Sequence, residues 1–210
     1  MKRILFILFF GITGIGFGQS SFVKNYTQPP WGANSMVIGS IVSTDTCYYL
    51  SGNCGDVNTT NGIPELFLMK CSLDGTAAWT KTYGDLNTDI YDIQTDMKLT
   101  SDNNLIILGY QIAANNTGGE IFVMKVNLFG DTLWTKTIDG PLNDYGLHIE
   151  ETSDSGFIIT GHTYSFVNPG SLGVYLIKLD SMGNLEWTQT YGGDLHGDQG
   201  MCVKQTSDGG

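Results

Sequence analysis

The sequence of 210 residues is built from a repeated unit. Three segments align without gaps: ELFLMKCSLDGTAAWTKTYG, EIFVMKVNLFGDTLWTKTID and GVYLIKLDSMGNLEWTQTYG. Their tryptophans, Trp79, Trp134 and Trp187, are 55 and 53 residues apart, and their glycines Gly75, Gly130 and Gly183 keep the same two spacings. A period near 50 residues is typical of propellers and solenoids.

A second block precedes each of these segments. It reads STDTCYYLSG, TSDNNLIILG and TSDSGFIITG, and a partial fourth copy, TSDGG, ends the sequence. Each unit therefore holds four short strand-like runs separated by turn residues, and none of them shows a 3.6-residue amphipathic period. In the third unit the predicted strands are Tyr145–Glu151, Phe157–Thr163, Val174–Asp180 and Leu185–Tyr191.

Four strands per unit predict an all-β, β-propeller-like fold made of four-stranded antiparallel blades. A β-solenoid, whose coils are usually shorter, and packed β-prism or sandwich units are the alternatives. The predicted divisions are a signal peptide at 1–18, a linker at 19–30, three complete blades at 31–84, 85–140 and 141–193, and the first strand of a fourth at 194–210. On this interpretation the chain is a fragment of an open propeller with an exposed edge.

The recurring landmarks have structural explanations. A tryptophan on the outer strand of every unit can fill the wedge between neighbouring blades, because a large aromatic ring buries about 150–250 Å². The recurring glycines fall in hairpin turns, where positive φ is needed. We therefore expect both sets to stabilise the fold and not to bind a ligand.

An aspartate stands ten residues before the turn aspartate in three units, namely Asp92, Asp144 and Asp198, while Ser35 holds that place in the first unit. A ring of carboxylates at the start of each inner strand could bind a cation on the propeller axis. A local role, in which each carboxylate accepts hydrogen bonds from backbone N–H groups of the adjoining turn, is the favoured interpretation.

No motif predicts catalysis, a metal centre or a cofactor. The chain lacks GxSxG, HExxH, P-loop and CxxC patterns. The three histidines, His148, His162 and His196, do not share a position in the repeat. The turns between the third and fourth strands carry their carboxylates at different positions, so they do not form a repeated calcium-binding loop. Cys47 and Cys71 fall at strand ends that antiparallel pairing could bring together, so a disulfide between them is possible, whereas Cys54 and Cys202 have no evident partner.

The first residues, MKRILFILFFGITGIGFGQS, resemble a secretory signal peptide that is cleaved after Gly18. The apolar run is shorter than the roughly 20 residues that span a bilayer. The formal net charge is −11, and Arg3 is the one arginine in the sequence. We therefore expect a secreted or cell-surface protein that binds no nucleic acid and is not inserted in the membrane after cleavage.

The loops suggest where a ligand would bind. The turns that join the first and second strands, and the third and fourth strands, are short and uniform. The loops at the opposite end of each unit differ in length and sequence among the copies, for example NCGDVNTTNGIPE, QIAANNTGGE and TYSFVNPGSLG. Loops on a rigid scaffold are where binding usually resides, so we expect the ligand-binding face there.

The segments WTKTYGD, TSDNNLIILG, WTQTYGGD and TSDGG resemble the secreted propeller-repeat proteins of Bacteroidetes-type bacteria. The resemblance covers Trp31 to Gly210 and implies export. Many such proteins carry a C-terminal type IX secretion sorting domain, which is absent from this sequence. The spacing of Gly75 and Trp79 also resembles the tryptophan-docking motif of quinoprotein propellers, but the absence of arginine after the signal peptide makes their cofactor a poor fit.

The resulting functional hypothesis is an exported, non-enzymatic propeller module without cofactors that binds an unknown protein or glycan at the cell surface. Two alternatives remain. The chain could be the N-terminal part of a secreted propeller enzyme, either a glycan-active hydrolase or a quinoprotein-like enzyme, or it could be a purely structural spacer.

Overall fold

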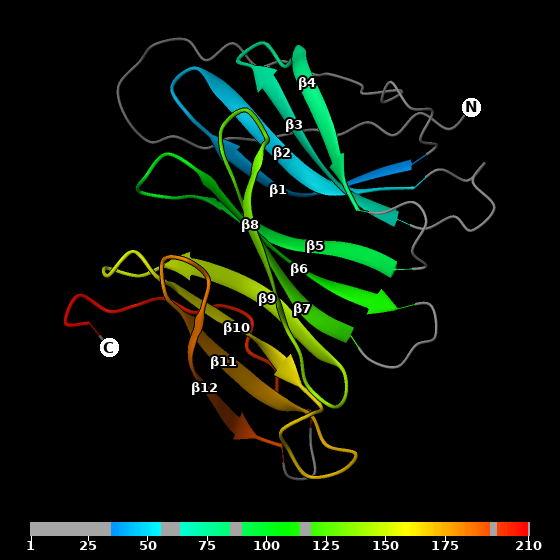
Figure 1. Ribbon diagram of the computed structural model, residues 1–210, viewed down its shortest axis with the longest axis vertical. Coiled ribbons are helices and arrows are strands. Elements are labelled where there is room, and N and C mark those ends of the chain that lie inside the picture. The colour runs from blue at the N-terminus through cyan, green and yellow to red at the C-terminus, as the bar shows by residue number, and fades with distance from the viewer. Residues whose placement is uncertain (1–34, 56–63, 85–89, 114–118, 194–196, 210) are drawn as a thin grey trace.

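The computed structural model describes residues 35–55, 64–84, 90–113, 119–193 and 197–209, so the predicted signal peptide, the linker and His196 lie outside the described residues. The described strands form three separate antiparallel sheets of four strands, each in chain order (Figure 1). The first sheet contains β1 (Ser35–Ser43), β2 (Cys47–Gly55), β3 (Pro64–Ser72) and β4 (Ala77–Tyr83). The second contains β5 (Ile90–Leu99), β6 (Leu105–Ala113), β7 (Gly119–Val126) and β8 (Thr132–Ile138). The third contains β9 (Asp144–Glu151), β10 (Phe157–Thr163), β11 (Gly173–Leu179) and β12 (Leu185–Gly192).

The three sheets follow one another as propeller-like blades (Figure 1). Strand β5 packs against β1, β2 and β3 of the first sheet, and β9 packs against β5, β6 and β7 of the second. The first strand of each blade is thus the one that meets the preceding blade. Separate antiparallel sheets match the predicted blades and differ from the parallel coils of a β-solenoid.

The second sheet is buried on both faces. Leu105 and Ile107 of β6 join a core with Tyr49 and Leu68 of the first sheet. The intervening residues Ile106 and Leu108 face the other way, into a core with residues of the third sheet. Successive side chains of a strand point to opposite faces. A continuous apolar run such as LIIL is therefore what a strand between two neighbouring blades requires.

The register of the first blade corrects one sequence alignment. Its first hairpin is one residue shorter than the others. Thr44 N–H donates to the Cys47 carbonyl, whereas Thr100 N–H in the second blade donates to the Asn104 carbonyl, one residue further along. As a result, the residue that pairs with Cys54 of β2 is Met36, just as Asp144 pairs with Thr163 at the same place in the third blade. Met36, and not Ser35, is therefore the structural counterpart of the recurring aspartate.

Residues 197–209 run beside the third sheet. Asp198 N–H donates to the Leu172 carbonyl, and Gly200 N–H donates to the Gly161 carbonyl. A turn follows in which Gly209 N–H donates to the Thr206 carbonyl. These bonds do not assemble into a named strand within the described residues, so the first strand of a fourth blade stays a prediction.

Candidate functional site

The recurring tryptophans lie between blades. Trp79 packs against the core shared by the first and second sheets, and Trp134 packs against the core shared by the second and third. Each lies against the turn glycine of the following blade: a Cβ atom at Gly130 would come within 3.0 Å of the Trp79 ring, and one at Gly183 within 2.8 Å of the Trp134 ring. Trp187, on the last strand, is 47% exposed.

A polar contact accompanies each of these packings. The Lys81 ammonium lies 2.8 Å from the Asp131 carboxylate in the following blade. The equivalent Lys136 donates to the Asn184 amide oxygen at 3.0 Å. The same strand and the same turn are therefore joined at both described junctions, which assigns these repeat positions to the assembly of the blades.

The turn aspartates are held by hydrogen bonds and ion pairs. Asp102 accepts a hydrogen bond from the Thr100 hydroxyl and pairs with Lys125 at 2.8 Å. Asp154 repeats this with Thr152 and Lys178. Burial opposes ionisation of Asp102, but its hydrogen bonds from Lys125, Thr100 and Asn104 prevail and hold its pKa at about 2. The hydrogen bonds from Thr152 and Lys178 likewise lower the pKa of Asp154.

Two of the recurring aspartates accept hydrogen bonds from described residues. Asp198 accepts one from Gly193 N–H, five residues earlier, at 3.0 Å. Asp144 accepts one from the Ser165 hydroxyl at 2.8 Å, and the side chain of Asp92 lies outside the described part. No group of three or more His, Cys, Asp or Glu side chains in the described ranges is placed to hold a metal ion.

Asp144 organises two loops at the variable end of the third blade. The Ser165 hydroxyl donates to Asp144 and accepts from Leu142 N–H at 2.9 Å, so it joins the loop before β9 to the loop after β10. Tyr164 N–H adds a bond to the Asn143 carbonyl at 3.0 Å. Asp144 itself is 1% exposed, and its Oδ1 atom is buried without a hydrogen-bond partner among the described residues.

Three apolar side chains stand at the surface of these joined loops: Leu142, Tyr164 and Phe166. We call them the loop-face patch. They are 50%, 37% and 46% exposed, respectively. Phe166 packs against Tyr175 of β11, with ring centroids 5.4 Å apart, so the third sheet supports its position. The sequence indicated this face through its loop variation, but it carried no signal for these particular residues.

Aromatic rings support the patch from below. The ring centroid of Tyr145 lies 4.7 Å from that of Tyr110, in an edge-to-face arrangement, and 4.8 Å from that of His162. The ring centroids of His162 and Tyr164 are 6.3 Å apart. Burial lowers the pKa of His162, although the nearby Asp144 charge opposes this shift. The layer is thus an apolar platform built from two adjacent blades.

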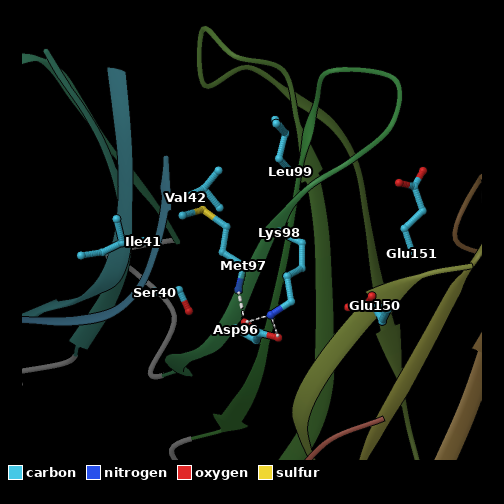
Figure 2. Close-up of a pocket in the computed structure, with 9 residues that line it drawn as sticks. All are labelled: Ser40, Ile41, Val42, Asp96, Met97, Lys98, Leu99, Glu150 and Glu151. Atoms are coloured by element: carbon cyan, nitrogen blue, oxygen red, sulfur yellow. Dashed lines mark hydrogen bonds and ion pairs between the residues drawn. The ribbon is translucent and has the colours of Figure 1, made fainter. Parts of the chain in front are cut away.

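A pocket of about 480 Å³ opens at the opposite end of the inner strands (Figure 2). Its walls come from the first three blades, at the ends of β1, β5 and β9 that lead into the short turns. The lining residues are Ser40, Ile41, Val42, Asp96, Met97, Lys98, Leu99, Glu150 and Glu151. Loop variation among the repeats predicts a ligand at the other end, and no feature of the sequence indicated this pocket.

A histidine, a cysteine and a carboxylate meet beside this pocket. The His148 Nε2 atom lies 3.8 Å from the Asp96 carboxylate and 3.7 Å from the Cys202 sulfur. His148 Nδ1 accepts from Val203 N–H at 3.4 Å, which leaves the proton on Nε2. A base that activates a thiol needs one nitrogen for the thiol and the other for the carboxylate. Here a single nitrogen faces both groups, which is not that arrangement.

The possible disulfide between Cys47 and Cys71 is not formed. All four cysteines are thiols, and strand pairing places Cys47 opposite Ser72 and Cys71 opposite Tyr48. This offset of one residue sends the two side chains to opposite faces of the first sheet. Cys47 accordingly belongs to the core shared with the second sheet, and Cys71 belongs to the core on the other face.

Comparison with known proteins supports the fold. No protein-family model matches the chain. The chain is similar to the uncharacterized WD repeat-containing protein L264 of Acanthamoeba polyphaga mimivirus, with 25% identity over 185 residues. The match covers 66% of this chain but only 13% of the viral protein's length. WD repeats form four-stranded propeller blades, in agreement with the three sheets and with a scaffold or interaction module.

The described residues contain no helix long and apolar enough to cross a bilayer.

Proposed function

We propose that this protein is an exported, non-enzymatic propeller module that binds a protein partner through the loop-face patch. The observation that carries the proposal is the Asp144–Ser165–Leu142 connection, which fixes two loops of one blade together and holds three apolar side chains at their surface. A rigid scaffold that presents exposed aromatic and aliphatic side chains has the character of a protein-binding hot spot.

A protein is favoured over a glycan as the partner. The patch combines Leu142 with Phe166, whereas Tyr164 is its single side chain with a hydroxyl group. The similarity to a WD-repeat protein supports the same choice, because repeat propellers serve widely as interaction scaffolds. Glycan binding is an outcome of the test below.

Export rests on the sequence. Met1–Gly18 has the basic start, the apolar run and the small residues around Phe17 that signal peptidases require. The resemblance of the repeat to secreted Bacteroidetes-type proteins supports the same compartment and a type IX secretion route. N-terminal sequencing of the exported protein should begin at Gln19.

We also infer a fourth blade. The turn near Thr206, with a hydrogen bond between the Thr206 and Asp208 side chains, repeats the pairs Thr100–Asp102 and Thr152–Asp154. Trp187 occupies the position that is covered by the next blade's turn at both earlier junctions. A further blade would cover it in the same way.

An enzymatic alternative has little support in the described residues. The one His–Cys–carboxylate cluster has the wrong proton arrangement for thiol activation, and no metal-ligand group is present in the described ranges.

The test is affinity capture from cultures of the source organism with three proteins. These are the wild type, the double variant Leu142→Ser/Phe166→Ser, and the control Phe129→Ser, which changes a side chain that is 73% exposed in a turn at the opposite end. The proposal expects one protein to be captured by the wild type and the control but lost with the double variant. Equal capture by all three would contradict the loop-face site, capture of nothing would favour a spacer, and binding on a glycan array would replace the protein partner with a sugar.

A further inference from the structure

The pocket in Figure 2 is separate from the loop-face patch. It lies where β1, β5 and β9 approach the short turns, whereas the patch lies where β9 starts and β10 ends. Its volume of about 480 Å³ is within the range of pockets that bind small ligands or single side chains.

The two sides of the pocket differ in chemistry. Val42 of β1 stands on one side, and Glu150 and Glu151 of β9 stand on the other, with the end of β5 between them (Figure 2). The Ile41 side chain points to the opposite face of the first sheet. Leu99, which is 39% exposed, extends the apolar wall. A ligand that fills the pocket must therefore be apolar along one part and polar at another.

The charges of the pocket are unevenly compensated. The Lys98 ammonium pairs with the Asp96 carboxylate at 2.9 Å. The Glu151 carboxylate accepts hydrogen bonds from the main-chain nitrogen and the hydroxyl of Ser101, at 2.7 and 2.8 Å. Glu150 has no ion pair or hydrogen bond with any residue in the described part of the chain. The pocket therefore keeps an excess of negative charge at Glu150.

We propose that this pocket binds the basic side chain of a partner, lysine or arginine. The aliphatic stem would lie along Val42 and Leu99, and the cationic group would donate to the Glu150 carboxylate. Long basic side chains bury their methylene groups on apolar surface while their charged ends stay with polar partners. The formal net charge of −11 also attracts basic ligands.

The proposal does not depend on the loop-face site. It is tested with the blocked amino acids N-acetyl-lysine N-methylamide and N-acetyl-arginine N-methylamide, titrated into the full chain carrying ¹³C-labelled methionine methyl groups. Met97 lines the pocket and reports on its filling. N-acetyl-citrulline N-methylamide, which has the shape of the arginine probe without its charge, is the ligand control.

The matched protein variants are Glu150→Gln and Glu120→Gln, because Glu120 lies on β7 outside the pocket lining. We expect a saturable shift of the Met97 methyl signal with a basic probe, at least a threefold loss of affinity in Glu150→Gln, and no change in Glu120→Gln. The affinity should also fall as salt is added. An unchanged amide spectrum of Glu150→Gln confirms that it is folded.

Three results would overturn the proposal. The first is the absence of saturable binding by either basic probe. The second is equal affinity in Glu150→Gln and the wild type, which would show that the cationic group does not bind the Glu150 carboxylate. The third is equal binding of the citrulline probe, which would make the pocket a site for neutral ligands.

Discussion

Trp79 lies against Gly130 of the following blade so closely that a Cβ atom at Gly130 would come within 3.0 Å of the indole Cη2. The same relationship joins Trp134 to Gly183 one blade later. Both glycines have φ of +77°, a conformation that disfavours other residues. The two most conspicuous features of the repeat, its tryptophan and its turn glycine, are therefore two halves of one contact between blades.

Replacement of Gly130 by alanine should destabilise the protein through both backbone strain and overpacking. We expect a loss of about 2–4 kcal/mol in the free energy of unfolding, measured by urea denaturation. Gly170→Ala is the control, since Gly170 has φ of +82° but no heavy atom within 4 Å of an added Cβ. The control should cost only about 1 kcal/mol. Equal losses in the two variants would mean that the contact with Trp79 contributes nothing.

The tryptophans should differ in their contributions to stability. Trp134 packs against the core between the second and third blades, so Trp134→Ala should lower the free energy of unfolding by about 2–3 kcal/mol. Trp187 is 47% exposed, and Trp187→Ala should change stability by less than about 0.5 kcal/mol. Urea unfolding followed by far-UV circular dichroism measures both. A large effect at Trp187 would show that its indole is covered in solution.

Acid should destabilise the protein through its turn aspartates. The pKa of Asp102 is about 2 in the folded protein, below the ordinary value of 3.8. A depressed folded-state pKa stabilises the fold above pH 4, and this contribution is lost as the pH falls from about 4 to about 2. Asp102→Asn should therefore be less stable than the wild type at pH 6, with the difference shrinking toward pH 2.

The measurement for this prediction is urea unfolding at several pH values between 2 and 6. Asp139→Asn serves as the control, because Asp139 is exposed and has no hydrogen bond or ion pair with the described residues. A pH-independent difference between Asp102→Asn and the wild type would contradict the assignment.

The thiols should react in two classes. Cys202 is exposed, whereas Cys47, Cys54 and Cys71 are buried. Ellman's reagent should titrate one thiol per native chain and all four in guanidinium chloride. Two thiols in the denaturant without reductant would instead reveal a disulfide, and rapid reaction of more than one native thiol would contradict the burial of the first blade's core.

Removal of the Ser165 hydroxyl should release the two loops. Ser165→Ala leaves the buried Asp144 carboxylate without the donor that the structure gives it, which should cost about 1–3 kcal/mol. Hydrogen exchange should rise at Leu142, whose amide donates to the same hydroxyl. Ser181→Ala, at an exposed turn position, is the control and should change neither quantity. An unaltered exchange rate at Leu142 would contradict the connection between the loops.

The local strand pattern was largely predictable. Phe157–Thr163 was predicted and observed with identical bounds, and the other three strands of that blade agree to within one residue at each end. Alternation and turn residues carry that information, because they act over a few neighbouring positions. The disulfide prediction was wrong for the complementary reason: whether Cys47 meets Cys71 depends on the pairing register, and a one-residue offset reverses the face of the sheet.

The repeat of four-stranded units, with tryptophan and glycine at fixed places, could be predicted from the amino-acid pattern, because the same local pattern folds the same way each time it recurs. Which of these positions meet depends on how the blades pack. The tertiary structure brought Trp79 to Gly130, joined Asp144 to Ser165, and left a pocket beside Glu150 where three inner strands come together. Such contacts depend on the distance and angle between blades, which no single unit of the sequence encodes.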